Sequence, residues 1–121
     1  MFESLGGDVL RVPVAGSAVL RAGGEWRDSG TPGFWIKPLL EDELAGVRTW
    51  LMKTEPGASS ILHDHNQIEQ IYVLEGHFSD GETSYGPGDF IVRAPGALHL
   101  STCEDGSLSL VIYSTPAGSR A

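Results

Sequence analysis

Short apolar segments of four to eight residues recur along the chain, and turn signals separate them. Typical signals are Pro32-Gly33, Pro56-Gly57, Asp80-Gly81 and Pro95-Gly96. Within residues 47–54, Trp50 and Met52 occupy alternate positions, as expected of a strand with one buried face. We expect strands at residues 8–12, 18–22, 34–39, 47–54, 69–74, 82–85, 89–93 and 108–114. This spacing predicts an all-β sandwich or barrel.

Two local features refine this picture. Residues 39–45, with the sequence LLEDELA, are the only helical candidate, and the segment is short enough to be a turn or an extended connection instead. Residues 79–82 predict a tight hairpin, because Asp80-Gly81 tolerates the positive φ angles of such a turn. Without internal repeats or a linker, residues 1–121 are expected to form one domain, with a frayed tail over residues 116–121.

Charge narrows the choice of partners. The chain has 16 acidic and eight basic residues, a net charge of -8, and no cluster of Lys or Arg. A phosphate backbone would be repelled, so nucleic acid and anionic membranes are not expected as partners. The single Cys103 cannot form an intrachain disulfide, and no apolar run approaches the ~20 residues of a membrane span. We therefore expect a cytoplasmic protein.

Three of the four histidines fall in one pattern with an acidic residue. His63 and His65 would project to the same side of an extended strand, about 7 Å apart, whereas Asp64 would point away. Glu69 is separated from His65 by an even number of positions, but an expected turn at residues 66–67 lies between them. Its carboxylate would therefore reach the same site from the neighbouring strand. His99 would bring a third imidazole from a different hairpin.

This pattern resembles the cupins, small double-stranded β-helix (jelly-roll) barrels. The first cupin motif, G-x5-H-x-H-x3-E-x6-G, is matched at every fixed position by Gly57, His63, His65, Glu69 and Gly76. The second motif, G-x5-P-x-G-x2-H-x3-N, is matched by Gly88, Gly96 and His99. It departs from the pattern at Ala94, where proline is usual, and at Cys103, where asparagine is usual. The two motifs lie within residues 57–103, and neither departure removes a ligand.

A narrower resemblance involves residues 35–39, 49–51, 56–57 and 72–80. These stretches are similar to the cupins of the acetylacetone and dihydroxyacetophenone dioxygenase group, and to the sensor domain of ChrR-type anti-sigma factors. The first resemblance implies an Fe(II)-dependent dioxygenase that acts on a small ketone or diketone. The second implies a non-catalytic module that senses a metal or a ligand. An isomerase, cyclase or lyase that uses the metal without oxygen is a third alternative.

A single histidine is more often a core or surface residue than a ligand, but the match of four candidate ligands to the cupin spacings implies a metal site. His63, His65, Glu69 and His99 form a nitrogen and oxygen donor set that suits one divalent transition metal: Fe(II), Mn(II), Ni(II), Cu(II) or Zn(II). We favour Fe(II), because of the dioxygenase resemblance.

The remaining expectations concern the cavity and its surroundings. An apolar lining would favour a small, weakly polar substrate, and the candidates for that lining are Trp35, Trp50, Met52, Phe78, Phe90 and Tyr113. His77 lies outside the motif but could approach the cavity, and Cys103 could face inward or lie in a loop. On residues 69–74, Glu69, Ile71 and Val73 should face inward and Gln70, Tyr72 and Leu74 outward. An outward apolar face needs cover from the N-terminal strands or from a second subunit, so we expect a homodimer.

Overall fold

The computed structural model describes residues 2–6, 9–21 and 23–117. Ten strands make up its regular structure. They are β1 (Phe2–Gly6), β2 (Ser17–Leu20), β3 (Arg27–Asp28), β4 (Phe34–Asp42), β5 (Val47–Thr54), β6 (Ile68–Gly76), β7 (Phe78–Ser79), β8 (Ser84–Tyr85), β9 (Phe90–Arg93) and β10 (Ser107–Ser114). The all-β prediction is confirmed, and the expected strand at residues 47–54 coincides with β5.

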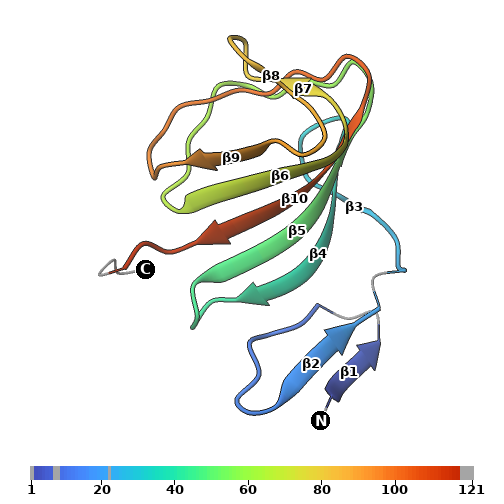
Figure 1. The fold of residues 1–121 in the computed structure, drawn as a ribbon, viewed down its shortest axis with the longest axis vertical. Helices are drawn as coiled ribbons and strands as arrows, with labels where there is room; N and C mark the ends of the chain where they lie inside the picture. Colours follow the sequence, from blue (N-terminus) through green and yellow to red (C-terminus); the bar gives the residue numbers. More distant parts are fainter. Residues whose placement is uncertain (1, 7–8, 22, 118–121) are drawn as a thin grey trace.

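A curved six-stranded sheet forms the main wall of the molecule (Figure 1). Its strands lie in the order β3-β4-β5-β10-β6-β9, and every neighbouring pair is antiparallel. The last long strand, β10, inserts between β5 and β6, so segments far apart in the sequence lie side by side. This crossover brings inward-facing side chains of three long strands onto one concave face.

The opposite wall consists of loops held by isolated bridges and by one small hairpin. Bridges join Ser59 to Thr102 and His63 to His99. A hairpin forms where one was predicted, but its turn spans residues 80–83, one residue later than predicted: β7 pairs with β8, and the Asp80 N–H donates to the Thr83 carbonyl at 3.2 Å. Gly81 sits at the tip with φ of 97°, a conformation that favours glycine. The two walls together enclose the barrel interior.

The N-terminal region differs from the prediction. Residues 9–12 do not form a strand; only Leu10 makes an isolated bridge, to Leu40 on β4. The first strand is β1, which pairs in parallel with β2 in a separate two-stranded sheet. Asp8, Ala22 and the tail residues 118–121 lie outside the described residues. The helical candidate at residues 39–45 is also absent, because β4 continues to Asp42 and a turn follows.

The core lies on the concave face of the main sheet. Ile71, Val73 and Val111 are buried there, and Glu69 is buried with them. Tyr72 and Leu74, at the intervening positions of β6, are 44% and 40% exposed. The predicted alternation of faces on this strand is therefore confirmed. None of the described residues forms a helix that could cross a membrane.

Candidate metal centre

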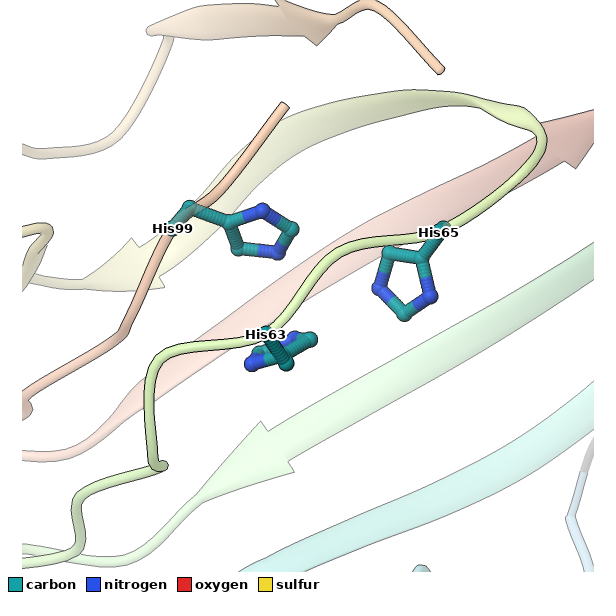
Figure 2. A group of neighbouring side chains, drawn as sticks. All are labelled: His63, His65 and His99. Carbon is teal, nitrogen blue, oxygen red and sulfur yellow. The ribbon is translucent and has the colours of Figure 1, made fainter. Parts of the chain in front are cut away.

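Three histidine side chains lie close together on two loops beside the main sheet (Figure 2). One ring nitrogen from each of His63, His65 and His99 lies within 4.8 Å of those from the other two. His63 and His65 come from the loop before β6, and His99 from the loop after β9. Two backbone hydrogen bonds, His63 N–H to His99 O at 2.8 Å and His99 N–H to His63 O at 2.9 Å, hold the two loops together. The alternation predicted for His63 and His65 thus arises in an extended loop with a single bridge.

Backbone carbonyls fix the orientation of two of the rings. His63 Nδ1 lies 2.7 Å from the Ile61 carbonyl, and His99 Nδ1 lies 3.0 Å from the Ala97 carbonyl. In each case the carbonyl is two residues before the histidine. Donation of the Nδ1 hydrogen to a carbonyl leaves Nε2 as the basic nitrogen, as in many histidine ligands of metals. The backbone carbonyl two residues before His63 and before His99 therefore sets the tautomer of each of these two rings.

Glu69 lies beside the histidines, but a cation also flanks it. Its Oε1 is 3.6 Å from His99 Nε2, and its Oε2 is 3.8 Å from His65 Nε2. Arg93 Nε lies 3.4 Å from the same Oε1. Register explains this contact, because Glu69 and Arg93 are directly opposite each other on β6 and β9. The structure therefore brings all four predicted site residues together and adds Arg93, which was not predicted from the sequence.

A second carboxylate lies on the far side of Arg93. Asp80 Oδ2 is 3.9 Å from Arg93 Nη1 and accepts a hydrogen bond from the Tyr85 hydroxyl at 2.5 Å. This hydroxyl and the turn N–H groups of Glu82 and Thr83 lower the pKa of Asp80 to about 2. Arg93 is thus held between two carboxylates. Asp80 was not predicted from the sequence, because it lies in the turn between the two motifs and no motif spacing links it to Arg93.

Burial controls the protonation of the site. The pKa values of His65 and His99 are lowered, chiefly because burial disfavours the imidazolium form. The pKa of Tyr113 is raised well above its ordinary range, first by burial and then by the adjacent Glu69 carboxylate. The two imidazoles are therefore neutral at pH 7, which is the form that binds metals.

These groups fit a divalent transition metal. His65 Nε2 and Glu69 Oε1 are buried and have no hydrogen-bond partner. Leaving such atoms unsatisfied costs about 1 to 3 kcal/mol each, and a cation among the rings would satisfy both. Imidazole nitrogen with one carboxylate is a donor set for Fe, Ni, Cu or Zn rather than for Ca or Mg. Three imidazoles could hold such an ion, and Glu69 is placed to bind it or to balance its charge.

The motif turns position these side chains. The Ala97 N–H donates to the Ala94 carbonyl at 3.1 Å, with Pro95 and Gly96 at the centre of the turn and Gly96 at φ of 80°. Pro followed by a positive-φ Gly is the type II arrangement, so Ala94 in place of proline leaves this turn intact. The Gly96 N–H also donates to the His65 carbonyl at 2.7 Å, which joins this turn to the loop that carries His63 and His65.

Cys103, the other departure from the motif, has a structural position. It is 2% exposed, and its Sγ donates to the His77 carbonyl at 3.1 Å. Its backbone carbonyl accepts from the Gly57 N–H at 2.6 Å. His77 itself is exposed and does not line the cavity, so neither residue contributes to the site.

A cavity of about 360 Å³ adjoins the histidines. Four of the predicted apolar lining residues are confirmed: Trp50, Met52, Phe78 and Tyr113. Two are wrong. Trp35 is not in the lining and instead donates its Nε1 hydrogen to Glu55 Oε1 at 3.1 Å. Phe90 is 57% exposed, because Ile91 and Arg93 take the inward positions of β9 and leave Phe90 and Val92 outside.

Comparison with known proteins agrees with this architecture. The model of the family described as the ChrR Cupin-like domain matches residues 17–117. No curated protein matches the chain. Among solved structures, an RmlC-like cupin from Shewanella frigidimarina superposes with a TM-score of 0.68 at 23% identity, covering 79% of this chain and 87% of that one.

Two further structures show the range of related proteins. KdgF from Halomonas sp. gives a TM-score of 0.65 at 26% identity, covering 77% of this chain and 89% of that one. A structure of Rhodobacter sphaeroides SigE in complex with the anti-sigma ChrR gives a TM-score of 0.67 at 22% identity, covering 77% of this chain and 51% of the matching one. The cupin fold expected from the histidine motifs is confirmed.

Proposed function

Because this chain belongs to the ChrR Cupin-like domain family, we propose that it binds one divalent transition metal and acts on a small uncharged molecule in the adjoining cavity. The proposed ligands are His63, His65 and His99, with Glu69 as a fourth ligand or as the charge that balances the ion. The observation that carries the proposal is the convergence of three ring nitrogens within 4.8 Å, beside the buried His65 Nε2 and Glu69 Oε1, which have no hydrogen-bond partner.

The cavity supports an uncharged substrate. None of the residues lining it is Lys or Arg, and neighbouring lining residues Trp50, Val111 and Ile71 give the sheet side an apolar stretch. A phosphate or a polyanion would therefore lose its hydration without gaining a cation from the protein. A small ketone or diketone needs no such partner, and its two oxygens could chelate an ion held by the histidines.

The reaction that we propose is oxygenation of such a ketone or diketone. A bound Fe(II) ion would supply Lewis acidity and a redox centre for dioxygen. The protein would contribute the rest: the histidines fix the ion, Glu69 offsets its charge, and Trp50, Met52 and Phe78 exclude water from the substrate. Zn, Ni, Mn and Cu fit the same donors, and an isomerase or lyase could use them without oxygen.

A sensor module is the second candidate. It is favoured by the family match and by the likeness to the structure in which the anti-sigma ChrR is bound to SigE. In that role the metal or a small ligand would change the affinity for a partner protein, and nothing would be consumed. We also propose a homodimer, since Tyr72, Leu74, Phe90 and Val92 on adjacent strands leave an outward apolar face exposed.

Oxygen consumption separates the two candidates. Anaerobic Fe(II)-loaded protein mixed with a β-diketone or a hydroxylated aryl ketone should develop a new absorption band. Admission of air should then consume oxygen in proportion to substrate, and His63→Ala and His99→Ala should not support this. Flat oxygen traces across a ketone panel, with Fe(II) shown to be bound, would favour the sensor or a non-oxidative reaction.

A further inference from the structure

The cavity has two chemically different ends. Ser107, Ser109, Val111 and Tyr113 occupy alternate positions on β10, and all four line the cavity. Tyr113 marks the metal end, because its ring centroid lies 5.2 Å from that of His65. Ser109 is four residues away along the strand, a separation of about 13 Å at ~3.3 Å per residue. Along β10, the cavity lining therefore changes from Tyr113, which lies beside the histidine rings, to the serine hydroxyls of Ser109 and Ser107.

Three hydroxyl side chains on β5 and β10 lie together at the far end, which we call the hydroxyl end: Thr54, Ser107 and Ser109. Ser29, Thr31, Ser60 and Ser101, from the loops, also line the cavity. Ser107 is directly opposite Thr54, and Ser109 is opposite Met52, so Ser109 and Thr54 are diagonal neighbours on one face. Thr54 is only 7% exposed and Ser109 only 5%. Neither hydroxyl makes a hydrogen bond to another residue in the part of the chain that the structure describes.

Both hydroxyls line the cavity, and neither oxygen is a fully buried atom without a partner, so each is open to the cavity. Each can therefore bond a ligand there without first breaking a hydrogen bond to the protein. On the sheet side of the cavity, Trp50, Val111 and Ile71 lie side by side between the two ends and form an apolar wall. A ligand that reaches from the histidines past these residues would place its far end against Thr54 and Ser109.

We propose that the hydroxyl end is a second recognition point, which selects a ligand carrying a neutral hydrogen-bonding group opposite its metal-chelating group. This inference rests on the proposed function and specifies its substrate class. The ligand would have a chelating pair of oxygens, an apolar middle on the order of 10 Å long, and a terminal hydroxyl or carbonyl. The absence of Lys and Arg from the lining excludes a terminal carboxylate or phosphate.

The experiment compares two probes on zinc-loaded protein, because zinc cannot oxidise them. One probe is a biphenyl β-diketone with a terminal hydroxyl on the distal ring, and the other is the same diketone without that hydroxyl. Calorimetry should show that wild type binds the hydroxylated probe about 3 to 10 times more tightly, the value of one net hydrogen bond. Ser109→Ala and the isosteric Thr54→Val should each reduce this preference and leave the affinity for the plain probe unchanged.

Controls keep the outcomes distinct. Both variants should retain wild-type zinc uptake, which shows that they are folded, and Ser84→Ala, an exposed serine on β8, should change nothing. Equal affinities of wild type for the two probes, or a preference that survives in both cavity variants, would overturn this inference alone. Binding of neither probe by zinc-loaded wild type would overturn the proposed function and the inference with it.

Discussion

Arg93 gives the sharpest test of the electrostatics around the candidate metal centre. Its side chain is 11% exposed and that of Glu69 is 7% exposed, with Nε and Oε1 3.4 Å apart. Removing one partner of a buried ion pair costs about 3 to 5 kcal/mol, because the other charge stays buried. The Tyr113 hydroxyl lies beside Glu69 and can donate to its carboxylate when Arg93 is removed, so we take the lower value. Arg93→Met should destabilise the metal-free protein by about 3 kcal/mol, or about 12 °C in Tm.

Metal binding should reverse much of this loss. A divalent ion among the histidines would take over the role of the guanidinium as the positive charge beside Glu69. If about 2 kcal/mol is recovered, the variant must bind the metal about 30 times more tightly than wild type, since 1.4 kcal/mol corresponds to a factor of ten.

The assay is thermal unfolding of both proteins with chelator and with Zn(II), together with a competitive zinc titration. Arg27→Met, which removes an exposed arginine on β3, is the matched control and should change neither quantity. Zinc affinity in Arg93→Met that equals or falls below the wild-type value would refute the reasoning, because Glu69 would then not interact with the ion.

Three further predictions concern the metal and the pH. Chelator should lower the Tm of metal-loaded wild type, because the ion binds only the folded state; identical Tm values at neutral pH would contradict this. His99→Ala should abolish zinc uptake, whereas Glu69→Gln should weaken it less, since the amide oxygen can still coordinate; an unchanged affinity and Co(II) spectrum in Glu69→Gln would show that Glu69 is not a ligand. Burial lowers the pKa of His65 and His99 below the ordinary imidazole value of 6.5, so the unfolded chain binds more protons below that pH. Metal-free protein should therefore be fully stabilised above pH 6.5 and lose stability as pH falls through the lowered pKa values. Zinc affinity should hold at pH 6.5 and decline below roughly pH 6. Chemical denaturation and zinc titration from pH 5 to 8 would test both trends, and a stability that rises on acidification would contradict the burial argument.

The sequence predicted those features that depend on local pattern. Strand β5 has the predicted bounds because its alternation and its flanking turns act within a few residues. The convergence of His63, His65 and His99 follows from motif spacing, since glycine turns place the loops and strand parity orients the rings. Even the altered turn at Ala94 retains its shape, because Pro95 and Gly96 supply the backbone angles that the turn requires.

Features that depend on pairing between distant strands could not be predicted. The segment 90–93 reads FIVR, and its apolar residues allow either face to be buried. Register decides the outcome: Arg93 faces Glu69, so Ile91 joins it inside and Phe90 and Val92 point outward. The same register creates the Glu69–Arg93 ion pair. The hydroxyl end likewise exists only because β10 lies beside β5.

The most direct test of the account is the metal content of the protein. Metal-free wild type would be dialysed against Fe(II), Ni(II) or Zn(II) at pH 7.5, without an affinity tag, and its bound metal measured by elemental analysis. His77→Ala is the matched control, because His77 is exposed and lies outside the cavity. The account predicts about one ion per chain for wild type and for His77→Ala, and none for His63→Ala. Wild-type protein that takes up none of the three metals would contradict it.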